Sequence, residues 1–344
     1  MNPLIMTGMH RSGTSAVARL VQSMGFNVGS HLLVATRNNR HGHFEEMGFI
    51  RFHDQLISRY FPDRAPFCEW LPLGDSEPLY GDAERNEARA LWESHRAGGS
   101  NSWKDPRTSL FLDLWADVLP DAKVVICLRH PYQVHLSLLR RGEPFLHVDY
   151  SAGIRGWTVY NERIRRALAR LPADRFLLVD VDTSFGEPER LAQRLADFLG
   201  VPLPATSSAS ITPDEFHFEA GLDEALRDFP AYFPEAAALH LAMQQEDFSP
   251  LNSAQPVTPL AIRSAEARLI EFESACGLRD KCQKMLIHSI AADRQRSSEL
   301  FRLSSQSNAE KDKLLAELSR FNEQLQAEVV RLRGAAAAED AQPA

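Results

Sequence analysis

The stretch that decides the fold is PLIMTGMHRSGTSAVARLVQSM, residues 3–24. A short apolar run at residues 3–6 predicts a strand that leads into a loop beginning at Gly8. Beyond the loop, apolar residues recur every three to four positions, which predicts one face of a helix. The order strand, glycine loop, helix is the order in which α/β proteins build a phosphate-binding site. The helical positions are Ala16, Val17, Leu20, Val21 and Met24.

The loop GMHRSGTS, residues 8–15, has the glycine spacing of a nucleotide-binding P-loop. Glycines let a backbone wrap closely around an anion, and free N–H groups at the helix start point toward it. Thr14, however, occupies the position of the lysine that nucleoside triphosphatases place on the β- and γ-phosphates. The nearest cation is Arg11, inside the loop. This pattern favours binding of a 5′-phosphate that carries one transferable group. The alternative is a strand-to-helix turn that binds no anion and needs its glycines only for the backbone conformation.

A second informative stretch is KVVICLRHPYQVHLS, residues 123–137. Its apolar run predicts a strand of a parallel sheet that is covered on both faces, and Pro131 suits the first turn of a helix. Arg129 follows the strand directly, at the edge where open α/β sheets bind ligands. Its planar guanidinium suits a phosphate, and Ser137 would add a hydroxyl donor. Arg129 considered alone is equally compatible with a surface salt bridge.

Strand and helix patterns alternate along the first 204 residues. Residues 175–181 form another apolar strand pattern, and residues 62–82, rich in Pro, Gly and acidic side chains, are expected to be irregular. Alternating strands and helices predict an α/β fold of the P-loop-NTPase-like type, with a mostly parallel sheet and helices on both faces. The segments with helical patterns are 44–61, 83–96, 108–119 and 188–199.

We assign residues 1–290 to one domain, in which the helices after about residue 204 have no firm positions. Residues 291–333 form a C-terminal helical extension with near-heptad apolar spacing. This helix either forms a coiled coil in a homodimer or packs on its own domain, and the pattern leaves both open. Residues 334–344 form an Ala-rich tail that we expect to be disordered. The apolar positions of the extension are Leu314, Leu318, Phe321, Leu325, Val329 and Leu332.

The composition of the chain excludes some classes of binding partner and indicates the cellular compartment. The formal net charge of -8 argues against broad nucleic-acid binding, although a few basic side chains can still form a local anion site. The four cysteines are scattered and predict no disulfide framework. The N-terminus lacks the features of a signal peptide, and no apolar stretch approaches the ~20 residues of a membrane span. We therefore expect a cytoplasmic protein without a membrane span, and no His/Cys spacing predicts a metal site.

The loop and the Arg129 stretch together resemble the sulfotransferase superfamily, in particular bacterial-type enzymes that use 3′-phosphoadenosine 5′-phosphosulfate (PAPS). The resemblance covers roughly residues 3–204. It implies that Arg11 contacts the bridging and sulfuryl oxygens of PAPS, and that Arg129 and Ser137 bind its 3′-phosphate. ATP has no 3′-phosphate, so this second site argues against a kinase. The residues implied to hold the 5′-phosphate are Ser12, Gly13, Thr14 and Ser15.

The same resemblance implies a catalytic base. An acceptor that attacks sulfur must lose a proton, so a carboxylate or imidazole near the donor is expected. The segment GHFE, residues 42–45, is similar to a Gly-aromatic-Glu pattern of bacterial sulfotransferases, which makes Glu45 the implied base. Glu46, His41 and His43 remain alternatives, and acidic residues at this position also suit a solvated helix start.

The segment SWKDPR, residues 102–107, is similar to a Lys-Asp-Pro motif of tyrosylprotein and bacterial sulfotransferases. It implies that Lys104 stabilises charge on the sulfuryl oxygens or the leaving phosphate. Asp105 would orient Lys104 or Arg107; the alternative is an ion pair that braces a loop.

The sequence thus predicts a sulfotransferase that moves a sulfuryl group from PAPS to an acceptor hydroxyl or amine, with PAP as the leaving group and without a metal. The resemblance implies a glycan, a glycolipid or another small molecule as acceptor, and its bacterial-type pattern favours a glycan or glycolipid. Two other functions remain open: a P-loop nucleotide kinase-like phosphotransferase, and a non-catalytic nucleotide-binding scaffold.

Overall fold

A computed structural model describes residues 2–34, 42–74, 76–203, 222–249 and 259–304. Within them, four strands form one sheet in the order β2-β1-β3-β4, and every neighbouring pair is parallel. The predicted parallel α/β fold is therefore confirmed. The strands are β1 (Leu4–Thr7), β2 (Ser102–Lys104), β3 (Lys123–Leu128) and β4 (Phe176–Asp180).

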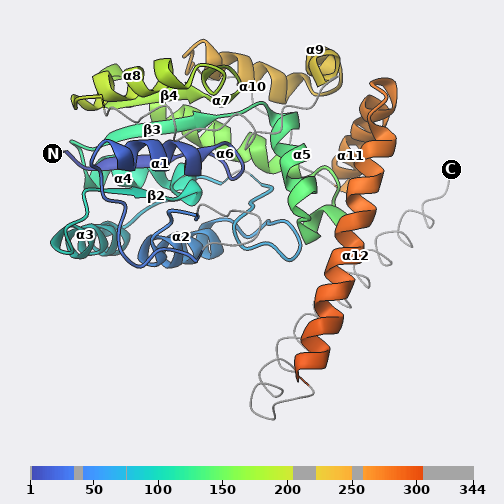
Figure 1. The fold of residues 1–344 in the computed structure, drawn as a ribbon, viewed down its shortest axis with the longest axis horizontal. Coiled ribbons are helices and arrows are strands. Elements are labelled where there is room, and N and C mark those ends of the chain that lie inside the picture. Colours follow the sequence, from blue (N-terminus) through green and yellow to red (C-terminus); the bar gives the residue numbers. More distant parts are fainter. Residues whose placement is uncertain (1, 35–41, 75, 204–221, 250–258, 305–344) are drawn as a thin grey trace. The chain divides into compact units, whose positions relative to one another are not determined.

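Helices make up most of the remaining described chain, and Figure 1 shows α1 in front of the sheet. Three of them are short 3-10 helices: η1 (Pro106–Phe111), η2 (Pro144–His147) and η3 (Ala173–Arg175). The α-helices up to residue 199 are α1 (Thr14–Ser23), α2 (Met47–Tyr60), α3 (Asp82–Ala97), α4 (Leu112–Val118), α5 (Pro131–Arg141), α6 (Ala152–Leu168), α7 (Val181–Ser184) and α8 (Pro188–Leu199). The later helices are α9 (Leu222–Tyr232), α10 (Pro234–Gln244), α11 (Pro259–Ala275) and α12 (Arg279–Ser304).

The sheet separates two hydrophobic clusters, as strand alternation requires. In β3, Ile126 belongs to a cluster with the aromatic side chains of α2, α4 and α6, whereas Cys127 belongs to a cluster with α1 and α8. Because both faces of β3 are covered, the whole strand is apolar after Lys123. The prediction of helices on both faces is confirmed.

Three segments that carry chemistry emerge at the same edge of the sheet. The glycine loop follows β1, Lys104 ends β2, and Arg129 follows β3. β1 lies between β2 and β3, and Met6 pairs with Lys104 in register. Parallel strands end on one side, so the sheet brings all three segments to one edge, where open α/β sheets bind ligands.

The structure corrects several sequence-based boundaries. Strand β2, in the SWKDPR segment, was not predicted, and the helix predicted over 108–119 is a 3-10 helix, η1, followed by α4. The helix predicted from residue 44 begins at Met47, because Phe44 has a φ of 57 and cannot be helical. Helix α6 was not predicted, although its apolar residues Ile154, Trp157, Ile164 and Leu168 recur at helical spacing.

The chain divides into two compact units, Met1–Ile287 and His288–Ala344. The predicted boundary at 290/291 falls within α12, and the near-heptad positions 314–332 lie outside the described residues.

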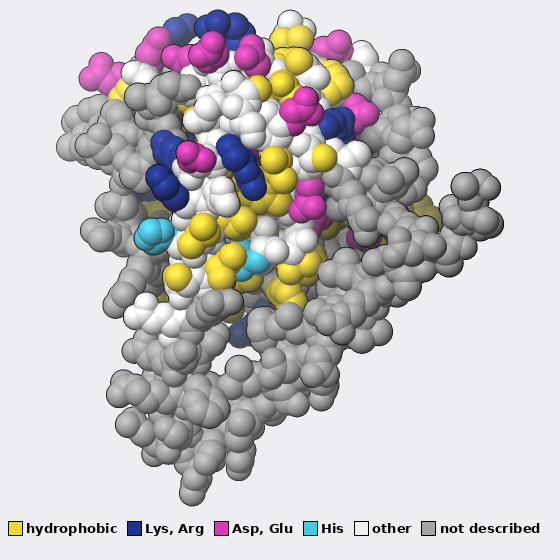
Figure 2. All heavy atoms as spheres, turned by 90° about the vertical axis from the view of Figure 1, so that its right-hand side faces the viewer, with side chains coloured by type: hydrophobic (Ala, Val, Ile, Leu, Met, Phe, Trp, Pro, Cys, Tyr) yellow, Lys and Arg dark blue, Asp and Glu magenta, His cyan; other side chains and the backbone are white. Residues whose placement is uncertain are grey.

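Figure 2 shows one face of the molecule on which hydrophobic side chains gather at the surface. Among the described residues, no helix is long and apolar enough to cross a membrane.

Candidate functional site

The loop after β1 has the backbone that an anion cradle needs. Gly8 has a φ of 137, and a Cβ there would lie 2.3 Å from the carbonyl oxygen of Cys127 on β3. Gly13 has a φ of 78, and its Cβ would meet the Phe185 ring at 3.0 Å. Arg11 adopts a φ of 70, a left-handed conformation that costs a non-glycine residue about 1–2 kcal/mol. Strain of this kind is held at binding sites by the surrounding structure.

The loop ends at the start of α1, which carries no cap. Gly13 is the N-cap residue, no side chain caps the helix, and its first turn contains no acidic residue. The first four N–H groups of a helix have no partner inside the helix and carry its partial positive charge. Helix α1 therefore presents its free N–H groups to any anion held by Ser12, Gly13, Thr14 and Ser15.

The two predicted anion sites are in direct contact. Arg129 Nη1 donates to the backbone oxygen of Arg11 at 3.2 Å, and Arg11 Nε donates to Ser137 Oγ at 3.0 Å. Gln133 Oε1 accepts from Arg129 Nε and Nη2 at 3.2 and 3.1 Å. Residues 129, 133 and 137 are spaced by four, which places Gln133 and Ser137 on one side of α5. The structure thus brings Arg11, Arg129 and Ser137 together.

Asp182 in α7 also faces Arg129. Its Oδ1 lies 3.6 Å from Arg129 Nε, and its Oδ2 accepts from the backbone N–H of His130 at 2.7 Å. Burial raises the pKa of Asp182 to about 6, and the charge of Arg129 opposes this in part. Burial, with Arg141 and Arg129 nearby, lowers the pKa of Arg11 to about 10, so Arg11 stays charged at neutral pH. A phosphate at Arg129 would compete with the Asp182 carboxylate.

Lys104 and Glu45 form a buried ion pair beside the loop. Lys104 Nζ lies 2.6 Å from Glu45 Oε1, 2.9 Å from the backbone oxygen of His43 and 3.3 Å from Ser15 Oγ. The side chains of Lys104 and Glu45 are 2% and 6% exposed, so each charge depends on its partner. The sequence-predicted base and the sequence-predicted lysine are therefore adjacent, and both border the start of α1.

Arg107 joins Glu45 to a second carboxylate. Its Nη1 lies 3.3 Å from Glu45 Oε2 and 3.0 Å from Asp105 Oδ1, and its Nε lies 2.7 Å from Asp54 Oδ1. Burial would raise the pKa of Asp105, but Arg107 and a hydrogen bond from His53 overcome it and hold that pKa well below its usual range. Asp105 thus orients Arg107, whereas Lys104 is oriented by Glu45.

The tautomer of His53 follows from its two hydrogen bonds. Trp115 Nε1, which can only donate, lies 2.9 Å from His53 Nε2. That nitrogen must therefore be the acceptor, and His53 Nδ1 carries the proton that it donates to Asp105 Oδ2 at 2.7 Å. His53, Asp105 and Trp115 are fully buried. A neutral imidazole thus anchors Asp105 to the hydrophobic core.

The alternative bases lie differently. Glu46 Oε2 accepts from the backbone N–H of His31 at 2.9 Å, so its carboxylate braces the loop before α2. The His43 side chain is buried, and burial lowers its pKa while Glu45 opposes this in part. His41 lies outside the described residues. Of the two glutamates, Glu45 is the one that contacts the predicted catalytic lysine.

His10, inside the loop, was not predicted as a site residue. Its ring packs against Trp70 in a tilted arrangement with centroids 4.0 Å apart, and its Nε2 is buried without a partner among the described residues. Burial, then the charge of Arg107, lowers the pKa of His10 well below its usual value, so the ring stays neutral. His10 and Trp70 form an uncharged wall next to Arg11.

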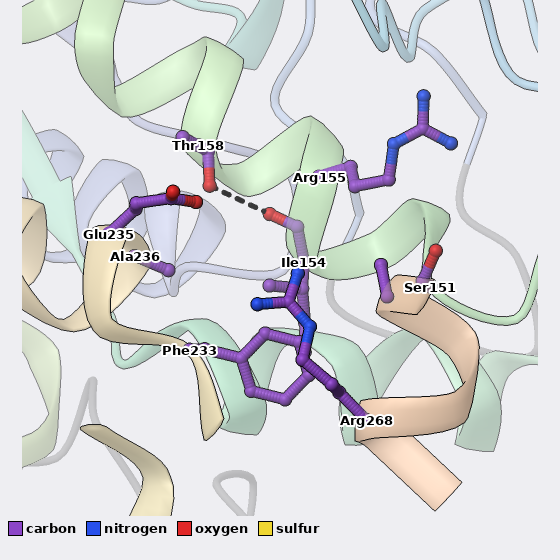
Figure 3. A pocket seen from close by; sticks show the side chains of 9 residues that line it. Ser151, Ile154, Arg155, Thr158, Phe233, Glu235, Ala236 and Arg268 are labelled. Carbon is purple, nitrogen blue, oxygen red and sulfur yellow. Dashed lines mark hydrogen bonds between the residues drawn. The ribbon is translucent and has the colours of Figure 1, made fainter. Parts of the chain in front are cut away.

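A separate pocket lies between α6, the start of α10 and the middle of α11, with a volume of about 70 Å³ (Figure 3). Arg155, Phe233 and Arg268 line it, and none of the predicted site residues does. It is therefore distinct from the candidate site at the strand ends. Within the described part of the chain, no group of three or more His, Cys, Asp and Glu side chains could hold a metal ion.

Sequence reasoning found the loop, Arg129, Ser137, Lys104 and Glu45, but it missed several of their partners. Arg107 was recognisable, because it follows Lys104 in the same motif. His53, Asp54 and Asp182 carry no local pattern, since only the folded chain brings them to the site.

Comparisons with known proteins identify the family of the chain. A profile of the sulfotransferase family matches residues 3–205, which is more than half of the 344 residues. A search of curated protein sequences gives no match.

Solved structures with a similar chain trace include three bacterial-type sulfotransferases. A sulfotransferase domain from the curacin biosynthetic pathway is 16% identical, with 72% of this chain and 98% of that chain covered and a TM-score of 0.43. A sulfotransferase from Mycobacterium avium is 16% identical, with 78% and 76% covered and a TM-score of 0.39. One from Alicyclobacillus acidocaldarius is 17% identical, with 71% and 96% covered and a TM-score of 0.41. Such low values carry no argument about donor, acceptor or mechanism.

Proposed function

The chain belongs to the sulfotransferase family, and on this premise we propose that it transfers a sulfuryl group from PAPS to an acceptor hydroxyl. The observation that carries the proposal is the contact between two anion sites: Arg129 binds the backbone of Arg11, and Arg11 binds Ser137. A donor with phosphate groups at both its 5′ and 3′ positions suits two adjacent cationic sites. A nucleoside triphosphate would leave the second site without a partner.

The residues present fit such a donor. The uncapped start of α1 and the positive φ of Gly13 suit the 5′-phosphate, and Arg11 at the loop suits the sulfuryl and bridging oxygens. Arg129 with Ser137 suits the 3′-phosphate, because a guanidinium can bind two phosphate oxygens at once. Thr14 stands where a phosphate-transferring P-loop protein has lysine, which disfavours the kinase alternative.

In the proposed reaction, an acceptor oxygen forms a bond to sulfur while the bond from sulfur to the bridging phosphate oxygen breaks. Glu45 accepts the proton that the acceptor loses. Arg11, Lys104 and the N–H groups of α1 stabilise the negative charge that develops on the sulfuryl oxygens and on the leaving phosphate of PAP. No step requires a metal ion.

The acceptor and the compartment are further parts of the proposal. The similarity of the GHFE and SWKDPR segments to bacterial sulfotransferases favours a glycan or glycolipid hydroxyl as acceptor. All four cysteines are unpaired, which favours a reducing compartment, and we place the protein in the cytoplasm.

Transfer of label from [35S]PAPS to a panel of glycan and glycolipid acceptors tests this function. Wild type should form a labelled product, and Glu45→Gln should lose at least ~100-fold in rate, the usual contribution of a general base. Turnover of ATP with Mg²⁺ instead would support a phosphotransferase. PAP binding without transfer to any acceptor would support the scaffold alternative.

A further inference from the structure

Glu45 holds a cation on each of its two oxygens. Lys104 Nζ lies 2.6 Å from Oε1, and Arg107 Nη1 lies 3.3 Å from Oε2. The carboxylate is also buried, with 6% of its side chain exposed. A proton that arrives at either oxygen must therefore compete with a positive charge. In this arrangement Glu45 is poorly placed to act as a base.

Lys104 is able to leave Glu45. Its ammonium ends a flexible four-carbon stem and donates in three directions. One of its contacts is Ser15 Oγ at 3.3 Å, in the first turn of α1, where the proposed 5′-phosphate would bind. An incoming phosphosulfate therefore offers Lys104 anionic oxygens within a short movement of its present position.

Arg107 is held in place. Asp105 Oδ1 binds its Nη1 at 3.0 Å and also accepts from its backbone N–H at 3.0 Å. Asp105 is fixed in turn by His53 at 2.7 Å, and His53 by Trp115 at 2.9 Å. Arg107 is thus held by a fully buried chain of hydrogen bonds that ends in the hydrophobic core. It therefore keeps its contact with Glu45 when Lys104 moves.

We propose that donor binding draws Lys104 Nζ from Glu45 to the phosphosulfate, which frees Glu45 Oε1 for the acceptor's proton, while Arg107 is the positioning residue that retains Oε2. The proposal rests on the proposed function and adds to it an order of events at the site. Glu45 becomes available only after the donor is bound, so the donor binds before the acceptor reacts.

Isothermal titration with PAP tests the exchange without an acceptor. Wild-type protein must break the Lys104–Glu45 contact when PAP binds, and Glu45→Gln removes that requirement. We expect Glu45→Gln to bind PAP about tenfold more tightly, which corresponds to ~1.4 kcal/mol. Lys104→Met should weaken PAP binding, and in that background Glu45→Gln should have no further effect. Glu46→Gln is the matched control, because its carboxylate binds His31 instead, and its PAP affinity should stay unchanged.

Two results overturn the exchange while leaving PAP binding intact. One is an unchanged or weaker PAP affinity in Glu45→Gln. The other is an equal gain in the Lys104→Met background, which would show that removal of a negative charge explains the whole effect. If Glu45→Gln does not fold, Glu45→Asp, which withdraws the carboxylate from Lys104, should show a smaller gain of the same sign. Failure of wild type to bind PAP at all overturns the proposed function and the exchange together.

The positioning role of Arg107 has its own readout. Arg107→Lys keeps the charge but loses the fork that joins Glu45 to Asp105. We expect PAP affinity within about twofold of wild type, with kcat for [35S]PAPS transfer lowered at least tenfold and KM unchanged. A kcat equal to that of wild type, or a parallel loss of PAP affinity and kcat, would contradict a specific effect on Glu45.

Discussion

In the proposed function, recognition of the donor's 3′-phosphate depends on Arg129. Its guanidinium is buried between Gln133, Asp182 and the backbone of Arg11. We predict that Arg129→Ala weakens PAP binding by about 10- to 100-fold, because a hydrogen bond to a charged group contributes ~1.5–3 kcal/mol. AMP, which lacks the 3′-phosphate, should bind the variant and wild type equally in a calorimetric titration. Equal loss for AMP would mean that Arg129 supports the loop and not the 3′-phosphate.

Asp182 gives the site a dependence on pH. Burial raises its pKa from 3.8 to about 6, so between these values the folded protein binds more protons at this group than the unfolded chain. This contribution to stability therefore falls as pH rises from about 4 to 6. We predict that Asp182→Asn, which cannot ionise, gains stability relative to wild type over this range, by up to ~3 kcal/mol. Urea unfolding of both proteins at the two ends of the range measures this, and a constant difference would contradict it.

Asp105 has a structural role that a substitution should expose. Asp105→Asn removes a fully buried carboxylate that lies 3.0 Å from the Arg107 guanidinium, and loss of one partner of a buried pair costs about 3–5 kcal/mol. Asp117→Asn is the matched control, because its pair with Arg85 is exposed and contributes at most ~1 kcal/mol. Equal unfolding midpoints of the two variants would show that the buried chain of hydrogen bonds adds no stability.

At the scale of elements, the glycine loop is held to the sheet by close backbone packing. Gly8→Ala would place a Cβ 2.3 Å from the carbonyl oxygen of Cys127, at a φ of 137. Gly25→Ala has a φ of 93 but meets nothing within 4 Å, so it isolates the backbone strain of about 1–2 kcal/mol. We predict that Gly8→Ala lowers the free energy of unfolding more than Gly25→Ala and also weakens PAP binding. Equal losses would mean that the β1 loop can move away from β3.

The elements that could be predicted from the sequence have local signals. The apolar run of β3 marks a strand covered on both faces, and Pro188 and Gly200 bound α8 as Pro and Gly commonly do at helix ends. Strand β2 escaped prediction because it has only three residues, one of them Lys104. A charged side chain can end a buried strand here only because Glu45, from a distant segment, pairs with it.

The residues of the candidate site also fall into those with a local sequence signal and those without one. Residues that touch the proposed donor lie in short motifs that carry their own pattern, such as the loop with Arg11. Residues that orient them, such as His53, come from elements far away in the sequence and act through single contacts. Sequence reasoning therefore identified the groups proposed to bind the donor, but it could not identify the buried chain that ends at Trp115.

At the scale of the whole molecule, a prediction concerns the C-terminal extension, residues 291–333. Ile270 on α11 and Ile287 on α12 are 40% and 57% exposed, and the second compact unit begins directly after Ile287. We predict that truncation after Ala291 converts a dimer to a monomer, because it removes the near-heptad positions 314–332. Sedimentation equilibrium of both chains measures the mass, and identical masses would favour the extension packing on its own domain.

The most direct test of the central claim is a calorimetric titration of the wild-type protein with PAP and, separately, with AMP. The account predicts that PAP binds at least ~100-fold more tightly than AMP, since two charge-assisted hydrogen bonds to the 3′-phosphate are worth ~3 kcal/mol or more. Equal affinities, or binding of ATP with Mg²⁺ in preference to PAP, would contradict a donor held by both Arg11 and Arg129.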